Sequence, residues 1–363
     1  MAERRVRSRR SAGEAVVGVP DATEPAGLVV VGRGPVAVAM RAWFSRPTPP
    51  DGTTWTVREV EEVPELDPQA CLAAADVVIL VLHEADFAAH SAMPAVERRA
   101  NRVAHVQRAL AAARAARVRH VVVISSAMVY GAGPGRPVIA DADPLTSTDE
   151  GLVGDLLAIE DVVASVRRRR SPLVTVLRPA PLVGQGIDTM ITRHFEAPRL
   201  LTVRGVVRDW QFAHVDDLAA AAEHVVRHRL AGALTVGAED VLSPTQVELA
   251  SGLRRIELAA VTAFGTAERL HKVGVLPSPS SELAYTVYSW TVASDRLRAS
   301  GWEAAWTSAA CLEVLLDAGS GRLAVAGRRV GARDAAAFGA AGAAVAFLST
   351  AAVWRQARAR RGR

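Results

Sequence analysis

A glycine turn between an apolar run and a helical stretch is the feature that most constrains this chain. Residues 28–31 read Leu-Val-Val-Val, and they enter the turn directly. Gly32 and Gly34 permit a tight turn and a close approach of the backbone to a pyrophosphate, and small Ala37 lets the following helix pack near the strand. Pro35 removes one N–H group but is tolerated in a first helical turn. The pattern predicts a phosphate-binding strand–turn–helix unit, with a tight connection that holds no ligand as the alternative.

Short apolar runs alternate with longer helical patterns over the first half of the chain. Runs that suit buried strands lie at residues 54–60, 77–82, 121–124 and 173–177. Longer patterns with helical periodicity lie between them, the longest at residues 94–117. This alternation is typical of a doubly wound parallel sheet, so we expect an α/β fold.

The composition argues against several classes of protein. Half of the 363 residues are hydrophobic, which is enough for a substantial core. The net charge of +5 comes almost entirely from arginine, since Lys272 is the only lysine, and no aromatic residues that could stack on bases interrupt the arginine runs. Cys71 and Cys311 lie far apart and form no disulfide framework. We therefore expect a cytoplasmic globular protein with no metal site and no specific nucleic-acid binding.

The two ends of the chain differ from its centre. Residues 1–26 are rich in Arg, Ser, Gly and acidic residues, which predicts a disordered basic arm. Residues 335–354 carry no charge and are long enough to span a bilayer, but most of them are alanine, and a basic tail follows at 355–363. We favour an Ala-rich helix that docks on a partner or on the same domain. Membrane association through this segment, as a peripheral helix or a span, is the alternative.

Several motifs in register give the chain a more specific resemblance. Residues 120–131 read His-Val-Val-Val-Ile-Ser-Ser-Ala-Met-Val-Tyr-Gly, and further matches follow at 177–184, 212–218 and 297–302. Together they resemble the NAD-dependent epimerase/dehydratase family of extended short-chain dehydrogenases/reductases, over residues 28–318. The resemblance implies a Rossmann domain that binds NAD, and a smaller C-terminal lobe for a small-molecule ligand such as a nucleotide sugar.

The resemblance also divides the chain and suggests cofactor contacts. It implies a NAD(P)-binding Rossmann domain at 27–180, a substrate-binding lobe at 181–320, and the Ala-rich helix with its basic tail at 321–363. Members of the family often dimerise through the helix at 148–170, so a homodimer is a further expectation. The cofactor-binding residues that it implies are Gly32, Gly34, Ala37, Glu59, Ser125 and Pro179. Glu59 would favour NAD through a ribose 2′-OH, whereas neighbouring Arg58 could receive the 2′-phosphate of NADP.

The proton-transfer pair of the family is missing from its expected place. Ser126 matches the serine or threonine that polarises the substrate, and Glu160 matches a glutamate four positions beyond the family's lysine. Counting back from Glu160 puts Leu156 at the lysine position and Leu152 at the tyrosine position. A leucine can neither take nor give a proton, and loss of general acid–base catalysis costs about 10²- to 10⁴-fold in rate.

Three other side chains are candidates for the site. His83 follows the apolar run 77–82, which places it at the carboxyl end of a predicted strand as a substitute proton-transfer group. Arg178 and Arg208 are candidate ligands for a substrate diphosphate, because a guanidinium binds such oxygens bidentately. The sequence thus leaves three hypotheses. They are an epimerase or dehydratase with an unconventional base, a non-catalytic dinucleotide sensor or scaffold that acts through a protein partner or membrane surface, and a protein that keeps only the Rossmann shape.

Overall fold

The computed structural model describes residues 26–47, 54–168, 171–320, 324–325 and 328–329. The basic arm expected at 1–26 lies outside these residues except for Ala26, which begins the first strand. The Ala-rich segment 335–354 also lies outside them. In the part of the chain that is described, no helix is both long and apolar enough to cross a membrane.

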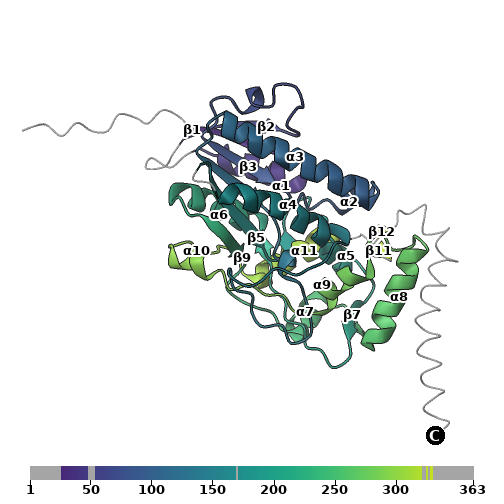
Figure 1. The fold of residues 1–363 in the computed structure, drawn as a ribbon. Helices are drawn as coiled ribbons and strands as arrows, with labels where there is room; N and C mark the ends of the chain where they lie inside the picture. The colour runs from purple at the N-terminus through teal and green to yellow at the C-terminus, as the bar shows by residue number, and fades with distance from the viewer. Residues whose placement is uncertain (1–25, 48–53, 169–170, 321–323, 326–327, 330–363) are drawn as a thin grey trace, which may run out of the picture.

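A six-stranded parallel sheet forms the centre of the molecule (Figure 1). Its strands, in the order β2-β1-β3-β4-β5-β9, pair in parallel throughout. Their bounds are β1 (Ala26–Val31), β2 (Trp55–Val60), β3 (Val77–Val81), β4 (His120–Ile124), β5 (Leu173–Pro179) and β9 (Gly232–Val236). Every residue of β3 and of β4 is buried, because helices cover both faces of the sheet. The doubly wound, Rossmann-like α/β fold predicted from the sequence is confirmed.

Two pairs of long helices pack along the sheet. They are α1 (Gly34–Phe44) beside α6 (Val215–Arg227), and α3 (Ala95–Ala115) beside α4 (Gly151–Arg167). A hydrogen bond of 2.8 Å from Trp43 Nε1 to Glu223 Oε2 joins the first pair. The order of the strands reverses between β1 and β3, and Gly32 and Leu82 follow these two strands. Ligands of such folds bind at this switch point, at the carboxyl ends of the strands.

The smaller lobe is built from short elements that follow β5. They are β6 (Leu182–Val183), α5 (Met190–Phe195), β7 (Leu200–Val203), β8 (Ala213–His214), α7 (Pro244–Ser251), β10 (Arg255–Leu258), α8 (Ala260–Lys272), η3 (Ser280–Leu283), α9 (Ala284–Val287), α10 (Asp295–Ala299) and α11 (Ser308–Gly319). The remaining short elements are η1 (Ala70–Leu72), α2 (Phe87–Ser91), η2 (Ala127–Tyr130), β11 (Ala324–Val325) and β12 (Arg328–Arg329). Strand β9 and helix α6 also follow residue 180, yet they complete the main sheet and its helical layer. The two units are therefore interleaved along the chain and do not simply follow one another.

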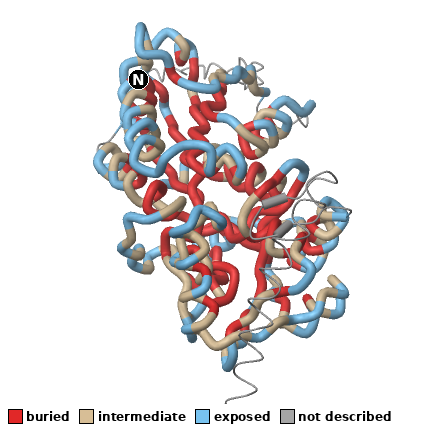
Figure 2. The backbone as a smooth tube through the Cα atoms, turned by 90° about the vertical axis from the view of Figure 1, so that its right-hand side faces the viewer, coloured by how far each residue is buried: buried red, intermediate tan, exposed pale blue. Residues whose placement is uncertain are grey.

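One continuous core joins the sheet to the smaller lobe. Buried backbone runs through the interior of the molecule, and exposed segments form its edge (Figure 2). Within the smaller lobe, Phe195, Trp210 and Phe212 pack in one aromatic cluster, with ring centroids 4.8 Å to 6.2 Å apart. These contacts join α5 to the segment that leads into β8.

Candidate functional site

A cavity of about 550 Å³ opens at the switch point of the sheet. Gly32 and Gly34 line it from the first turn, and His83 lines it from the loop after β3. Ser126 comes from the end of β4 and Leu152 from the first turn of α4. The motifs singled out from the sequence thus meet in one hollow, although they are up to 120 residues apart in the chain.

The glycine turn can be formed only by glycines. Gly32 has φ +139°, and a Cβ built there would lie 2.8 Å from the Cβ of Val81. Gly34 has φ +79°, and its Cβ would lie 2.9 Å from the backbone oxygen of Glu84. Helix α1 begins at Gly34 with Pro35 in its first turn, while Ala37 is buried beneath the turn and is not part of the cavity wall. The turn thus brings bare backbone to the cavity, which is what a pyrophosphate requires.

Helix α4 presents leucines where the resemblance expects the tyrosine and the lysine. Leu152 and Ile159 line the cavity, and Leu156, on the same face of the helix, is 0% exposed in the core. Ser126 is buried, and its Oγ accepts a hydrogen bond of 3.3 Å from Met128 N–H, which caps η2. The expected positions therefore do face the site, but they carry no group that can exchange a proton.

The tyrosines of the smaller lobe do not rebuild the missing pair. Tyr285 donates its phenol proton to the carbonyl oxygen of Met128 at 2.8 Å, and burial raises the pKa of the phenol. Tyr288 packs against Phe264. Lys272 lies on the exposed end of α8, where its Nζ pairs with Glu268 at 3.0 Å. The described residues therefore contain no tyrosine with a lysine beside it.

His83 is a neutral imidazole in the cavity wall. The residue is 7% exposed, and its Nδ1 has no hydrogen-bond partner among the described residues. Burial lowers the pKa of His83 to about 4, and the positive charge of Arg102 acts in the same direction. A group with this pKa is a weak base near neutral pH. His83 therefore lies in the right place for proton transfer, but its pKa is too low for it.

Glu282, which the sequence did not point to, is a buried acid in the cavity wall. It belongs to η3, is 4% exposed and lines the cavity. Its Oε1 accepts a hydrogen bond of 2.5 Å from the backbone N–H of Leu152. Burial raises the pKa of its carboxyl group above the ordinary value. Glu282 and Leu152 are 130 residues apart, so no local pattern in the sequence could reveal this contact.

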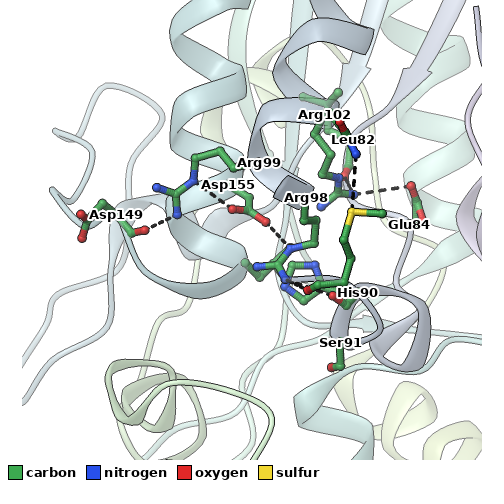
Figure 3. A network of polar contacts seen from close by, with 12 residues as sticks. Leu82, Glu84, His90, Ser91, Arg98, Arg99, Arg102, Asp149 and Asp155 are labelled. Atoms are coloured by element: carbon green, nitrogen blue, oxygen red, sulfur yellow. Dashed lines mark hydrogen bonds and ion pairs between the residues drawn. The ribbon is translucent and has the colours of Figure 1, made fainter. Parts of the chain in front are cut away.

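Arginines of α3 hold helix α4 in place beside the cavity (Figure 3). Arg98 donates from Nε to Asp155 Oδ2 at 2.6 Å, and Arg99 donates from Nε to Asp155 Oδ1 at 3.0 Å. Farther along α3, Arg102 donates from Nη2 to the carbonyl oxygen of Leu82 at 2.7 Å. Asp155 is fully buried, and Arg98 is also part of the cavity wall. The network brings a fixed positive charge to the α4 side of the site.

The structure places the two expected diphosphate ligands outside the cavity. Arg178 is buried and forms a two-point ion pair with Glu160, and its Nη1 lies 2.7 Å from Tyr130 Oη. Arg208 is buried and donates to three backbone carbonyls of residues 285–288, over the ring of Trp210. Because internal partners occupy both guanidinium groups, each arginine holds the fold together and neither lines the cavity.

Three residues expected to contact the cofactor also lie outside the cavity wall. Glu59 pairs with Arg41 of α1 and is absent from the cavity wall. Ser125 is buried and donates to Glu160 Oε1 at 2.5 Å, and Pro179 ends β5 without lining the cavity. Three acids that follow β2 do line the cavity, namely Glu61, Glu62 and Glu65. Glu61 and Glu62 each pair with Arg33 at 3.3 Å.

Comparison with known proteins gives a family and a set of relatives. The family model described as "NAD dependent epimerase/dehydratase family" matches residues 56–237, half of the chain. Curated relatives include uncharacterized proteins of Mycobacterium tuberculosis and Mycobacterium bovis, each 29% identical over 231 residues. These residues cover 62% of this chain, and the chain spans 61% of the length of each relative.

Solved structures share the fold over most of the chain. MoeE5 in complex with UDP-glucuronic acid and NAD is 20% identical, with a TM-score of 0.57 over 80% of this chain and 98% of that one. The UDP-glucose 4-epimerase of Bifidobacterium longum, in complex with NAD⁺ and UDP, is 16% identical, with a TM-score of 0.57 over 80% and 97%. The UDP-N-acetylglucosamine 4-epimerase of Bacillus cereus is 16% identical, with a TM-score of 0.56 over 83% and 98%.

The glycine turn at the switch point, the Ser126 loop and the matched residues agree with one another. The chain belongs to the NAD-dependent epimerase/dehydratase family.

Proposed function

We propose that this chain binds NAD and a nucleotide-sugar-like ligand in the cavity at the switch point, without the family's usual phenol-based proton transfer. The observation that carries the proposal is the glycine turn. Gly32 and Gly34 bring bare backbone to a cavity of about 550 Å³, and side chains at either position would collide with β3 or with the loop after it. Such a turn fits a dinucleotide pyrophosphate.

The acids at the end of β2 favour NAD over NADP. Glu61 and Glu62 line the cavity and neutralise Arg33, which is the cation nearest to them in the turn. A carboxylate in this place can accept a hydrogen bond from a ribose 2′-OH and repels a 2′-phosphate. Arg33 would have to leave both glutamates to receive a 2′-phosphate, and Arg108, another cation beside them, pairs with Glu62 and Glu65. NADP is therefore the less favoured cofactor.

The second ligand is proposed from the shape of the cavity and from the relatives. The wall continues from the sheet into the smaller lobe, where Asp188, Met190 and Trp290 line it. Several structures with the same fold were solved with UDP sugars, among them MoeE5 with UDP-glucose and NAD. A nucleotide sugar placed between the two units would lie beside the cofactor, with its sugar near Ser126.

Leu152 and Leu156 of α4 support the proposal that this site lacks the family's usual proton transfer. The family's proton acceptor is a tyrosine phenol that a neighbouring lysine ammonium activates. Leu152 and Leu156 provide neither group at the expected positions. The same observation favours a second candidate, a dinucleotide sensor or scaffold that acts through a protein partner or a membrane surface. The two candidates share the binding step and differ only in turnover.

The binding step can be tested directly on the full chain. We expect NAD to bind to the purified protein in calorimetric titrations, and more tightly than NADP. The Gly34→Ala variant should bind NAD at least about tenfold more weakly, because its Cβ would press on the loop after β3. Gly135→Ala, at a similar φ of +67° but with no atom within 4 Å of the new Cβ, is the matched control and should bind like the parent protein. Absence of NAD binding by the folded parent protein would overturn the proposal.

A further inference from the structure

We propose that Glu282 is the proton-transfer group of this cavity, in place of the tyrosine that the family uses. The inference rests on the proposed function, because it needs a bound dinucleotide and a sugar hydroxyl in the cavity. It assigns a chemical role to the smaller lobe, since Glu282 belongs to η3 and reaches a site whose other parts come from the sheet.

Two contacts place Glu282 between the end of β4 and the start of α4. On one side its Oε1 accepts the N–H of Leu152 at 2.5 Å, so the carboxyl group lies against the residue that replaces the tyrosine. On the other side the phenol of Tyr285, three residues farther along the chain, donates to the carbonyl of Met128 at 2.8 Å. Met128 is two residues from Ser126, and all these groups except Tyr285 line the same cavity. The segment therefore bridges both walls where a substrate hydroxyl would lie.

The first turn of α4 is shaped to admit this carboxyl group. Gly151 has φ +60°, and a Cβ built on it would lie 2.1 Å from Glu282 Oε1 and 2.7 Å from its Cδ. Any other residue at position 151 would push Glu282 away from Leu152. The positive φ alone favours glycine at this position. The close approach of Glu282 is a second constraint, because it leaves no space for any side chain.

The surroundings of Glu282 suit a carboxyl group that exchanges protons. Burial raises its pKa, and the charge of Asp155 acts in the same direction. The positive charge of Arg98 and the hydrogen bonds from Ser278 and Leu152 oppose this rise. Tyr285 faces the same group as a neutral phenol. A general acid or base works best when its pKa is moved towards the working pH, as burial does for a carboxyl group.

The proton-transfer step balances with the bound cofactor. The O–H proton of a sugar hydroxyl would pass to the Glu282 carboxylate. The bound cofactor would supply the oxidant, an oxidised nicotinamide that accepts the hydrogen on the same carbon with its electron pair. Glu282 would then be neutral beside a ketone, and return of the proton and of the hydrogen to the ketone would regenerate its carboxylate. Ser126 is placed to orient the oxygen during both steps.

Glu282 could instead serve only as a structural cap. Helix α4 has no capping bond from the side chain of its own N-cap residue, Glu150, and a carboxylate at this end of a helix is stabilising. The Glu282→Gln variant separates the two roles. Its amide oxygen can still accept the N–H of Leu152, but it cannot carry the proton.

The experiment uses the full chain loaded with NAD and three probes, UDP-glucose, UDP-glucuronic acid and UDP-N-acetylglucosamine. We expect the parent protein to turn over at least one probe, seen as its 4-epimer by chromatography or as reduced nicotinamide by absorbance. Glu282→Gln should lower kcat at least about 100-fold, with KM changed less than about threefold and an unchanged melting temperature. The acidic limb of the pH profile of kcat should disappear from the residual activity. Glu97→Gln, which changes an exposed acid in the first turn of α3, is the matched control and should turn over like the parent.

Two results would overturn the assignment. One is a Glu282→Gln variant with the parent's kcat. The other is a parent protein that binds NAD and a probe yet converts none of the three, which would leave the binding proposal standing. Failure of NAD to bind at all would overturn the proposed function, and with it this assignment.

Discussion

Arg98 of α3 donates from Nε to Oδ2 of Asp155 at 2.6 Å, and the aspartate is 0% exposed. Asp155 lies between Leu152 and Leu156 on the turn of α4 where a tyrosine–lysine pair is expected. This turn therefore carries an ion pair, but the pair faces α3 and holds α3 against α4 (Figure 3). Where the resemblance expects a reactive pair, α4 carries leucines, and its ion pair is a buried one that joins two helices.

Removal of Asp155 should destabilise the protein strongly. In Asp155→Ala, Arg98 and Arg99 lose the carboxylate that both contact, and breaking a buried pair costs about 3–5 kcal/mol. Urea unfolding at neutral pH measures the loss. Glu248→Ala is the control, because it breaks the exposed pair with Arg255, and such pairs contribute about 0–1 kcal/mol. Equal stability of the two variants would show that the buried pair does not hold α3 to α4.

Gly151 and Gly252 form a matched pair of glycines for a test of the space around Glu282. Their φ angles are +60° and +65°, but only a Cβ at Gly151 would meet another residue, since Gly252 has nothing within 4 Å. Gly252→Ala should cost about 1 kcal/mol of unfolding free energy, from backbone strain alone. Gly151→Ala should cost about 1–3 kcal/mol more, because Glu282 must move from Leu152. Equal losses in urea unfolding would mean that Glu282 is easily displaced.

The strands and the glycine turn could be predicted from the sequence because their signals are local. A strand that is buried on both faces is a continuous apolar run, as in β3 and β4, and Gly32 and Gly34 mark the turn by composition. The position of Leu152 followed from counting along one helix. All of these features depend on residues that are neighbours in the chain.

The rest of the site depends on contacts that a sequence does not display. Glu59 was expected to contact a ribose 2′-OH because of its place at the end of the second strand, but its side chain pairs with Arg41 of α1. The acids that line the cavity come from the loop after β2. Arg178 and Arg208 have the right chemistry for a diphosphate. Their N–H groups are already used inside the fold, which only the tertiary structure reveals. Glu282 reaches Leu152 across 130 residues of chain.

His120 should make the stability depend on pH. Its Nε2 lies 2.8 Å from Thr175 Oγ1, and that hydroxyl donates its proton to the carbonyl of Leu230, so Nε2 donates to the hydroxyl oxygen. Burial lowers the pKa of His120 to about 4, and the charge of Arg229 acts in the same direction. Below about pH 6.5 the unfolded chain binds a proton that the folded chain does not, so this contribution to stability is lost as pH falls from about 6.5 towards 4.

The His120→Gln variant isolates this effect, because its amide can donate to Thr175 but does not titrate. On going from pH 7.5 to pH 5, the parent protein should lose about 1–2 kcal/mol more unfolding free energy than the variant does. Urea unfolding at the two pH values gives this difference. A constant difference would mean that His120 can be protonated without opening the fold.

Substitutions that restore the family's tyrosine and lysine on α4 should destabilise the protein, and the lysine should cause most of the loss. Leu156 is 0% exposed in the hydrophobic core, so Leu156→Lys buries an ammonium with no carboxylate assigned to it and should cost about 3 kcal/mol or more. Leu152 borders the cavity, so Leu152→Tyr has room for its ring and should change stability by less than about 1 kcal/mol. Urea unfolding of both single variants and of the double variant tests this contrast, with the parent protein as reference. A Leu156→Lys variant as stable as the parent would mean that the ammonium can turn into the cavity and that the turn can accommodate the family's pair. The expected loss would mean instead that the hydrophobic core excludes a cation at this position, so the family's tyrosine–lysine pair cannot be restored by these two substitutions alone.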